Sequence, residues 1–497
     1  MMSQIRRSYS KSIQSIKNSK LFRQESYVNG KWISAANGRT VPVYDPATRE
    51  EIGTIPELTK SEVSAAIDSA KEAFPEWSKM IPKERGALLR NWFNLINDNK
   101  EDLAQIMTAE CGKPLVESRG EIVYGNSFIE WFAEEAKRQY GDVIPTTAKG
   151  KRYLVIKQPV GVSALITPWN FPNAMITRKA APALAAGCTV VIKPATETPF
   201  SALALAELAE QAGIPKGVLN VVTSSHDLTA EIGKELATNP NVRKLSFTGS
   251  TRVGKILMSQ CSSTIKKVSL ELGGNAPFIV FDDADVDAAV KGAIASKYRN
   301  AGQTCVCANR FLVQAGVYEE FSEKFKKAIS ELKVGNGNQE GVQIGPLIND
   351  NASKKVGSMI QDAKDKGAKV LYGGNNLKLN FWQPTLLGDV SLDMLVSKEE
   401  IFGPVAPLYK FETEEEAIKI ANNTDVGLAG YFYSRDIGRV FRVAEALEYG
   451  MIGVNEGLIS NEVAPFGGVK ESGLGREGSR YGIDEYSVMK YICLGGV

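Results

Sequence analysis

Apolar runs the length of one strand alternate with amphipathic stretches in the central part of the chain. The first run, residues 162–167 (VSALIT), is largely apolar, which suits a strand buried on both faces. Further runs of this kind occur at 189–193, 218–223, 244–249 and 266–272, and patterns of helical period separate them. This alternation predicts a parallel sheet with helices on both faces, an architecture that typically binds dinucleotides.

A second alternation of strands and helices follows Pro277 and continues to about residue 455. Ahead of the first alternation, residues 141–157 form an extended pattern that ends in alternating apolar and polar positions. We therefore predict an α/β fold with two doubly wound parallel-sheet domains and an extended arm.

The charge balance and the histidine count exclude several classes of protein. The 497 residues include 59 basic and 57 acidic side chains, a net charge of +2, so no nucleic-acid partner is expected. The longest apolar stretch, residues 180–192, contains proline and glycine and is too short to span a membrane. The single histidine, His226, lies in a polar turn, and there is no C-x-x-C pair, so no metal site is expected. Acid–base chemistry would then fall to carboxylates or lysines.

The first twenty residues differ from the rest in composition. They contain several lysines and arginines and many serines, and no acidic residue occurs before Glu25. Such a composition is typical of a mitochondrial presequence, and equally of a disordered basic tail. We expect residues 1–20 to be one of these two, and the protein to lie in the mitochondrial matrix or the cytoplasm.

A glycine-containing segment, GSTRVGK at 249–255, follows a predicted strand and opens a predicted helix. A nucleotide triphosphatase would next carry a Ser or Thr for its Mg²⁺ ion, but this chain has Ile256, which argues against that class. The free N–H groups of a helix N-terminus still favour an anion, so Gly249 and Ser250 can hold a phosphate. The usual G-x-G-x-x-G fingerprint is absent, so a dinucleotide would be held differently.

Cys305 lies in a segment of small and polar residues, SKYRNAGQTCVCANR at 296–310. Gly302 would let the backbone come close to a ligand. A thiol in such a loop can be exposed and electropositive enough to ionise, as a nucleophile must. The alternative is an inert buried cysteine, because free cysteine is among the most buried residue types.

Segments spread along the chain resemble motifs of the aldehyde dehydrogenase family, over nearly the whole chain from about Leu21. They are PWNFP (168–172), IKPATETPF (192–200), SLELGGN (269–275), GQTCVCANR (302–310), EEIFGPV (399–405) and PFGGVKESGLGREG (465–478). The resemblance implies an enzyme that forms a dimer or tetramer and acts on a small aldehyde. It also implies three parts: a dinucleotide-binding domain (21–139 and 160–271), a catalytic domain (272–463) and an oligomerisation arm (140–159 and 478–497).

The resemblance also implies how catalysis proceeds. Cys305 is the nucleophile, whose thiolate adds to the aldehyde to give a thiohemiacetal. The side-chain amide of Asn170 and the backbone N–H of Cys305 stabilise the oxyanion. After hydride transfer a thioester remains, and Glu271 is the general base for the water that hydrolyses it.

The cofactor implied by the resemblance is NADP or NAD. Lys193 corresponds to a ribose ligand, Ser250 to a pyrophosphate contact and Glu400 to a ligand of the nicotinamide ribose. NAD-preferring members carry a glutamate where this chain has Thr196, whose hydroxyl can donate to a 2′-phosphate, so we expect NADP to be accepted at least as well as NAD. The implied cofactor-binding residues are Trp169, Lys193, Thr196, Gly249, Ser250, Glu400 and Phe402.

Within the family, the sequence is similar to succinate-semialdehyde dehydrogenases, enzymes of GABA degradation. In that subfamily the residues matching Arg178, Arg299 and Ser460 hold the distal carboxylate of the substrate, and a guanidinium is the best bidentate partner for a carboxylate. Cys307 also matches the subfamily pattern, and a reversible disulfide between Cys305 and Cys307 is conceivable. Two alternatives stay open: a broader enzyme such as a glutarate-semialdehyde dehydrogenase, and a catalytically silent homologue.

Overall fold

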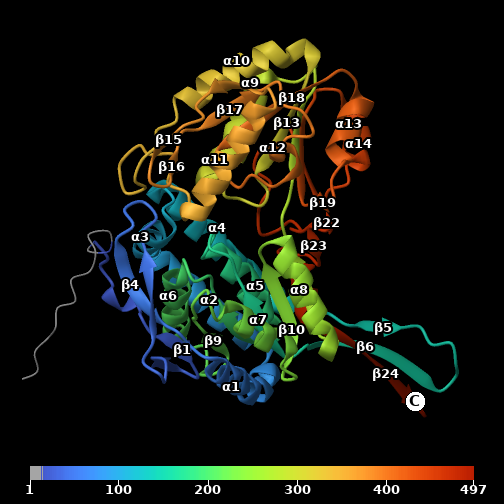
Figure 1. The fold of residues 1–497 in the computed structure, drawn as a ribbon. Helices are drawn as coiled ribbons and strands as arrows, with labels where there is room; N and C mark the ends of the chain where they lie inside the picture. The colour runs from blue at the N-terminus through green and yellow to red at the C-terminus, as the bar shows by residue number, and fades with distance from the viewer. Residues whose placement is uncertain (1–12, 14) are drawn as a thin grey trace, which may run out of the picture.

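A computed structural model describes Ile13 and residues 15–497 of the chain (Figure 1). Two lobes, each centred on a sheet, lie one above the other, and a ribbon of strands projects from the lower lobe. Residues 1–12 and 14 lie outside the described residues, so the predicted presequence or tail and the predicted compartment stay predictions. Among the described residues, no helix combines the length and apolar character needed to cross a bilayer.

The few described residues of the predicted tail contact the lower lobe. The backbone N–H groups of Lys17 and Asn18 donate to the Asp102 carboxylate on helix α3, over 3.1 and 2.8 Å. A short 3₁₀ helix, η1 (Ser19–Leu21), follows and places Leu21 in the core.

The lower lobe is built on an 8-stranded sheet whose central strands are parallel. In spatial order its strands are β2 (Lys31–Ile33), β1 (Ser26–Val28), β9 (Leu219–Val221), β8 (Thr189–Lys193), β7 (Val162–Ile166), β10 (Val242–Thr248), β11 (Lys267–Glu271) and β23 (Gly473–Leu474). From β7 the chain runs outward through β8 and β9, then returns to β10 on the other side of β7. Sheets of this kind bind ligands outside the carboxyl ends of the strands, where the order reverses.

Helices cover both faces of this sheet because its strands are apolar on both sides. Helices α1, α7 and α8 pack on one face and α5 and α6 on the other, with α2, α3 and α4 outside them. Their bounds are α1 (Lys60–Lys79), α2 (Pro82–Asp98), α3 (Lys100–Cys111), α4 (Leu115–Glu135), α5 (Ala174–Ala186), α6 (Pro199–Gln211), α7 (Thr229–Thr238) and α8 (Thr251–Cys261).

The upper lobe holds a 7-stranded sheet, again mostly parallel. Its strands are, in order, β14 (Lys369–Tyr372), β17 (Thr385–Gly388), β18 (Val405–Phe411), β13 (Ala308–Gln314), β12 (Ala276–Val280), β20 (Ala429–Tyr433) and β21 (Met451–Val454). The helices around it are α9 (Val286–Tyr298), α10 (Tyr318–Ser330), α11 (Asp350–Asp365), α12 (Leu395–Lys398), α13 (Glu414–Asn422) and α14 (Ile437–Ala446). The predicted α/β fold with two parallel-sheet lobes is confirmed.

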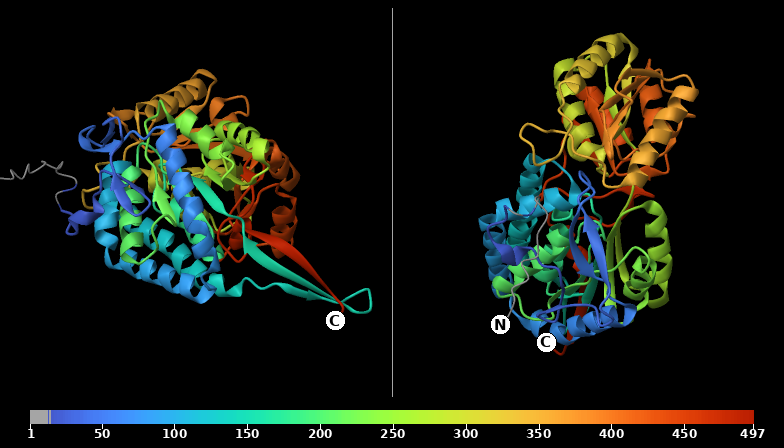
Figure 2. Two further views of the ribbon diagram at one scale, coloured as in Figure 1. Left: turned by 90° about the horizontal axis from the view of Figure 1, so that it is seen from below. Right: turned by 60° about the vertical axis from the view of Figure 1, so that its left-hand side comes forward.

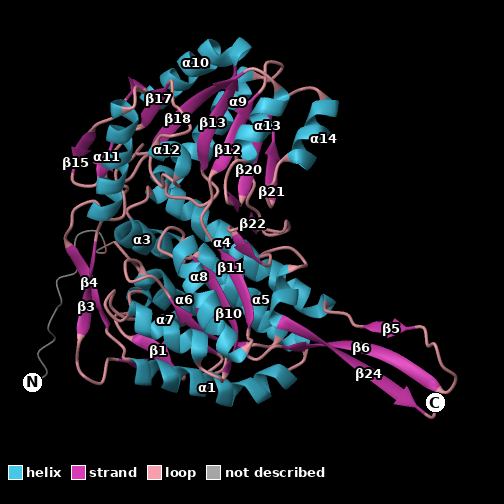
Figure 3. Ribbon diagram, turned by 45° about the vertical axis from the view of Figure 1, so that its right-hand side comes forward, coloured by secondary structure: helices cyan, strands magenta, loops and turns pink. Residues whose placement is uncertain are grey.

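A long antiparallel ribbon forms the arm that projects from the lower lobe (Figures 2 and 3). It consists of β5 (Asp142–Ile144), β6 (Lys151–Pro159) and β24 (Ser487–Gly495), with β6 in the middle. Apolar side chains on it face solvent in the single chain: Val143 and Met489 are each 77% exposed.

The remaining elements are short pairs of strands and single turns of 3₁₀ helix. The strand pairs are β3 (Thr40–Tyr44) with β4 (Glu51–Pro56), β15 (Asn376–Lys378) with β16 (Phe381–Trp382), and β19 (Val426–Gly427) with β22 (Val469–Lys470). The 3₁₀ helices other than η1 are η2 (Ala136–Arg138), η3 (Ser262–Thr264), η4 (Arg299–Gly302), η5 (Ala315–Val317) and η6 (Gly482–Tyr486).

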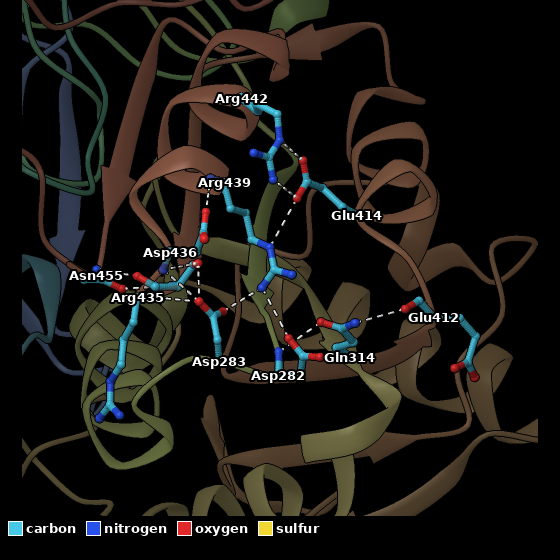
Figure 4. A network of polar contacts seen from close by, with 11 residues as sticks. Asp282, Asp283, Gln314, Glu412, Glu414, Arg435, Asp436, Arg439, Arg442 and Asn455 are labelled. Carbon is cyan, nitrogen blue, oxygen red and sulfur yellow. Dashed lines mark hydrogen bonds and ion pairs between the residues drawn. The ribbon is translucent and has the colours of Figure 1, made fainter.

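A network of charged residues joins α13 and α14 to the carboxyl end of β12 (Figure 4). The Arg439 guanidinium bridges Asp283 and Glu414, over 2.7 and 3.2 Å, and lies over the Phe281 ring at 4.6 Å. Burial alone would raise the pKa of Asp283, but hydrogen bonds from Ser434 and from backbone N–H groups, together with the Arg439 charge, hold it below its usual value. The network lies at the opposite end of the upper sheet from the Cys305 loop, so we assign it a structural role.

Candidate active site

A cavity of about 280 Å³ is lined by residues of both lobes. It brings together many of the predicted site residues, from segments far apart in the sequence. Those that line it are Trp169, Asn170, Gly249, Ser250, Glu271, Cys305, Glu400 and Phe402. The predicted nucleophile, oxyanion ligand and general base therefore surround one space, next to residues predicted to hold the cofactor.

The Cys305 loop begins with a left-handed turn between α9 and β13. Asn300, Ala301 and Gly302 all have positive φ, at 53°, 55° and 77°. Such a conformation costs a non-glycine residue roughly 1–2 kcal/mol, so the surroundings must stabilise it. A Cβ on Gly302 would lie 2.3 Å from the carbonyl oxygen of Gly403. The close approach of the Gly403 backbone therefore requires a glycine at position 302, and the expected contact of Gly302 with a ligand stays a prediction.

Hydrogen bonds from neighbouring segments hold this turn. The backbone N–H of Asn300 donates to the Glu117 carboxylate on α4, over 2.9 Å. The Asn300 side chain donates to the carbonyl oxygens of Asn170 and Gln303, over 2.9 and 3.3 Å. Burial raises the pKa of Glu117 to about 7. Glu117 is not among the predicted site residues, because nothing in its helix marks it as a contact of a loop some 180 residues away.

Asn170 is buried against the Cys305 loop. Its side-chain nitrogen donates to the Gln303 carbonyl oxygen over 3.0 Å. The Lys113 ammonium, itself paired with Glu121, donates to the Asn170 carbonyl oxygen over 2.7 Å. Because an amide nitrogen carries two protons, one N–H of Asn170 stays available for an oxyanion.

Glu271 ends strand β11 and is buried, and its Oε2 atom has no hydrogen-bond partner among the described residues. Burial raises the pKa of its carboxyl well above the usual value, and the negative charge of Glu477 adds to this. The positive charges of Arg178 and Lys179 act in the opposite direction. A carboxyl with a raised pKa is a stronger base once it is ionised, as a general base for water requires.

Arg178 takes part in a fully buried cluster of charges. Its Nε lies 2.6 Å from Oε2 of Glu477, and the Lys179 ammonium bonds to the other carboxylate oxygen. The guanidinium also lies over the Phe466 ring at 3.9 Å. Its Nη2 has no hydrogen-bond partner among the described residues, so it can still bind an anion.

Arg299 and Ser460 lie outside the lining of the cavity. Arg299 is half-buried, with its guanidinium 5.2 Å from the Phe171 ring. Ser460 lies close enough to Tyr124 for its hydroxyl to lower the pKa of that phenol, and Tyr124 was not among the predicted site residues. Arg178 and Arg299 are close enough to Cys305 for their charges to lower its pKa, so both predicted cations stand near the thiol.

The thiol of Cys305 is neutral in this environment. Burial, together with the negative charges of Glu400 and Glu271, raises its pKa to about 12. The positive charges of Arg178 and Arg299 lower the pKa, but by less. The residue is only half-buried by surface area, but it lines a deep cavity with two carboxylates nearby. Two carboxylates and two guanidinium groups therefore act on the thiol in opposite directions, and its ionisation during catalysis stays a prediction.

Several cofactor-side residues lie around the same cavity. Ser250 is the N-cap of α8 and accepts a hydrogen bond from the Val253 N–H over 3.4 Å. The rings of Trp169 and Phe402 meet edge to face at 5.6 Å. Burial raises the pKa of Glu400 to about 7.

Lys355 was missed by the sequence analysis although it lines the cavity. It lies on helix α11, and its ammonium donates to the Glu400 carbonyl oxygen over 2.6 Å. A lysine in an amphipathic helix carries no signal that separates it from a solvated one.

Lys193, the last residue of β8, and Thr196, just after it, are not among the residues that line this cavity. Lys193 is buried, which lowers the pKa of its ammonium to about 8, although the charge of Glu197 raises it. The Thr196 hydroxyl donates to the Ser224 carbonyl oxygen over 3.1 Å. The predicted contact of this hydroxyl with a 2′-phosphate would require it to turn from Ser224, and that contact stays a prediction.

Cys307 is buried and points away from solvent. Its thiol donates to the carbonyl oxygens of Lys297 and Ala308, over 3.4 and 3.5 Å. Every cysteine of the described chain is free. Among the described residues, no group of three or more His, Cys, Asp and Glu is arranged to hold a metal ion.

Comparison with known proteins places nearly the whole chain in one family. The sequence model of the aldehyde dehydrogenase family matches residues 32–492. The glutarate-semialdehyde dehydrogenase of Pseudomonas putida is 62% identical, over 96% of this chain and 99% of that protein. The succinate-semialdehyde dehydrogenase [NADP(+)] of Escherichia coli is 60% identical, over 97% of this chain and 99% of that protein.

Solved structures agree with the sequence comparisons. The crystal structure of an Escherichia coli NADP-dependent enzyme superposes with a TM-score of 0.95 at 60% identity, over 97% of this chain and all (100%) of that one. Fold, motifs and cavity thus agree over nearly the whole length, and the chain belongs to the aldehyde dehydrogenase family.

Proposed function

We propose that this aldehyde dehydrogenase oxidises succinic semialdehyde to succinate, with NADP or NAD as hydride acceptor. The observation that carries the proposal is a pair of guanidinium groups near the Cys305 thiol. They belong to Arg178 and Arg299, and their positive charges lower the pKa of the thiol. A simple aliphatic aldehyde needs no cation there, whereas a distal carboxylate does. Ser460, which lies near Tyr124, would add a hydroxyl to the same carboxylate site.

Glutaric semialdehyde, one methylene longer, is the second candidate substrate. It carries the same distal carboxylate, and the Pseudomonas putida relative named for it is 62% identical to this chain. One methylene changes binding in a pocket by only about 1–3 kcal/mol, so one enzyme can accept both.

The residues around the cavity fit a nicotinamide dinucleotide. The Thr248 hydroxyl lines the cavity, is buried and has no hydrogen-bond partner among the described residues, so it can bind a ligand. Gly249 and Ser250 at the N-terminus of α8 would hold the pyrophosphate, since the N–H groups there favour an anion. Trp169, Phe402 and Glu400 would line and bind the nicotinamide half, and Lys193 the adenosine ribose. When bound, the nicotinamide accepts a hydride.

Each catalytic residue then has one task. Cys305 gives its proton to solvent, its sulfur forms a bond to the aldehyde carbon, and the C=O π bond opens to an oxyanion that the free N–H of Asn170 and the Cys305 backbone N–H stabilise. Loss of hydride leaves a thioester on Cys305. Glu271 takes a proton from water, the hydroxide adds to the thioester carbon, and the C–S bond breaks to release the acid and the thiolate.

Aldehyde-dependent formation of reduced nicotinamide tests this function directly. We expect kcat/KM for succinic and glutaric semialdehyde to exceed that for butanal and pentanal by about ten- to a hundredfold, the worth of a charge-assisted hydrogen bond. We also expect NADP to be accepted at least as well as NAD. Equal rates with butanal would contradict the carboxylate site, and no reduction with any aldehyde would indicate a silent homologue.

Replacing Arg299 tests the carboxylate site itself. Arg299→Ala should raise KM for succinic semialdehyde by about ten- to a hundredfold and leave KM for butanal nearly unchanged. Arg299→Lys, which keeps the charge but not the planar fork, should recover part of the loss. Arg178 is a poorer first target, because its removal also strips Glu477 of a buried partner. An equal rise in KM for both aldehydes would show that Arg299 acts on the structure only.

We also propose that oxidation joins Cys305 and Cys307 in a reversible disulfide. Peroxide should inactivate the enzyme, and dithiothreitol should restore it, because a disulfide across so short a ring is easily reduced. In Cys307→Ser the same treatment should leave the enzyme largely inactivated, since Cys305 then oxidises beyond a disulfide. Identical recovery of the wild type and Cys307→Ser would show that Cys307 only packs.

The arm supports a homo-oligomer, a dimer or a tetramer. A single chain leaves Val143, Met489 and Tyr491 exposed on one ribbon, and apolar side chains gathered in this way favour contact with another surface. A second copy of the chain is the proposed partner.

A further inference from the structure

A buried ion pair, Lys113 with Glu121, contacts the backbone of the predicted oxyanion ligand Asn170. Lys113 lies between α3 and α4, Glu121 lies on α4, and both side chains are only 1% exposed. A buried ion pair is often no more stabilising than apolar side chains of the same volume, because both charges lose their hydration. A role beyond stability is therefore to be sought in the groups that the pair contacts.

The Lys113 ammonium has three partners. It bonds to the Glu121 carboxylate, donates to the Asn170 carbonyl oxygen over 2.7 Å, and lies 4.0 Å from the centre of the Phe171 ring. An ammonium group carries three N–H bonds, so three partners fix its position. Asn170 and Phe171 are neighbours in the chain, and Lys113 thus holds the segment that carries the oxyanion ligand.

The Glu121 carboxylate holds the other end of that segment. Its Oε1 atom accepts hydrogen bonds from the backbone N–H groups of Asn173 and Ala174, over 2.9 and 3.2 Å. These groups begin helix α5, and the Asn173 side chain makes no capping bond. Glu121 therefore acts as the cap, and its charge suits the positive end of the helix dipole. Residues 170–174 are held by the ion pair at both ends.

The Cys305 loop holds Asn170 through separate hydrogen bonds. The Asn300 side chain donates to the Asn170 carbonyl oxygen over 2.9 Å, and the Asn170 side chain donates to the Gln303 carbonyl oxygen over 3.0 Å. A carbonyl oxygen has two lone pairs, so Lys113 and Asn300 together satisfy that of Asn170. With the backbone and one amide proton fixed, the direction of the second amide proton, which an oxyanion needs, is fixed as well.

We propose that Lys113 and Glu121 are positioning residues for the oxyanion, and that they act through Asn170. The pair keeps the free N–H of Asn170 where the oxyanion forms, so that the donor need not reorganise during the reaction. An oxyanion forms both when the thiol adds to the aldehyde and when water adds to the thioester, so both halves of the reaction depend on the pair. The inference rests on the proposed function and extends its site.

Pre-steady-state kinetics of Lys113→Met test the inference. Methionine keeps an unbranched buried side chain and removes the donor. We expect the burst of reduced nicotinamide to slow by about ten- to a hundredfold, because a group misplaced by about 1 Å can cost a hundredfold in rate. The aldehyde concentration that half-saturates the burst rate should stay near the wild-type value, since no predicted ligand of the distal carboxylate is changed. As a control, Arg119→Met breaks an exposed ion pair with Glu101 between the same two helices and should leave the burst unchanged.

A cycle with Asn170→Ala separates positioning from a general structural effect. Loss of the oxyanion donor alone should slow the burst by about 10²–10³-fold. If Lys113 acts through Asn170, Lys113→Met should add little to Asn170→Ala, because the group that it positions is already absent. If the two effects instead multiply in full, Lys113 acts on another part of the site, and the inference is overturned.

A double variant separates the effect on the rate from the effect on stability. Lys113→Met leaves the Glu121 carboxylate buried without its partner, which destabilises the fold. Lys113→Met/Glu121→Gln removes both charges, while the glutamine oxygen can still cap α5, so the thermal stability should return towards that of the wild type. The burst should stay slow, because Asn170 still lacks the Lys113 donor. A burst that recovers together with the stability would overturn the inference. So would a double variant that does not fold, since the pair would then serve the fold alone.

The same measurements distinguish this inference from the proposed function. The absence of a burst in both the wild type and Arg119→Met, with succinic and with glutaric semialdehyde, would overturn the proposed function and this inference with it. A wild-type burst that the Lys113 variants reproduce would leave the proposed function standing and exclude only the positioning role of the pair.

Discussion

Cys305→Ala is expected to abolish aldehyde oxidation while the protein still folds and binds the nucleotide. Cys305 is the one thiol that lines the cavity of the described structure, so no other sulfur is placed to attack the aldehyde. We expect turnover to fall to the background of the assay, with NADP binding, measured by quenching of tryptophan fluorescence, within about twofold of the wild type. Substantial turnover by Cys305→Ala would exclude Cys305 as the nucleophile.

A matched control and a chemical probe strengthen this experiment. Cys493→Ser changes an exposed thiol on the arm and should leave turnover intact. Because burial and the neighbouring carboxylates raise the pKa of Cys305 to about 12, its thiolate fraction in the free enzyme is small near neutral pH. Alkylation by iodoacetamide should therefore be slow at pH 7 and accelerate as pH rises. Rapid, pH-independent alkylation at neutral pH would contradict a protonated thiol.

Glu271→Gln is expected to separate the two halves of the reaction. Hydride transfer needs no general base for water, so one equivalent of reduced nicotinamide per site should form in a burst. Hydrolysis of the thioester should then slow by about 10²–10⁴-fold, the usual contribution of a general base. Stopped-flow absorbance measures the burst, and mass spectrometry should detect the acyl group on Cys305.

The pH dependence of the wild type follows from the position of Glu271. Burial and the charge of Glu477 raise the pKa of its carboxyl, so the basic form appears only as pH rises through that value. Steady-state turnover limited by hydrolysis should rise with pH over this range, and the rise should be absent in Glu271→Gln. Hydroxylamine, a nucleophile that needs no general base, should restore turnover to the variant. A variant without a burst that hydroxylamine does not rescue would place Glu271 in another role.

The strands of the lower sheet, as they follow one another along the chain, could be predicted from the sequence. The apolar run at 162–167 is strand β7 (Val162–Ile166), because a strand buried on both faces leaves an unbroken apolar pattern. The predicted phosphate-binding segment opens helix α8, because Ser250 is a good N-cap for local reasons. Such signals span a few residues, so they can be read without knowledge of the tertiary structure.

The charged groups that surround each site residue could not be predicted from local sequence patterns. Arg178 and Glu477 form a buried pair although they are about 300 positions apart, and no local pattern predicts which carboxylate meets which cation. The neutral state of the Cys305 thiol likewise depends on Glu400 and Glu271, which reach it from other segments.

Gly302 and Thr196 show the same division between sequence and tertiary structure. The chain alone shows a glycine three residues before Cys305 and a threonine three residues after Lys193. The contact of Gly302 with the Gly403 backbone and the hydrogen bond from Thr196 to Ser224 appear only in the folded structure. Residue types and local periodicity are properties of the chain, whereas pKa values and free hydrogen-bond donors depend on which distant segments fold against them.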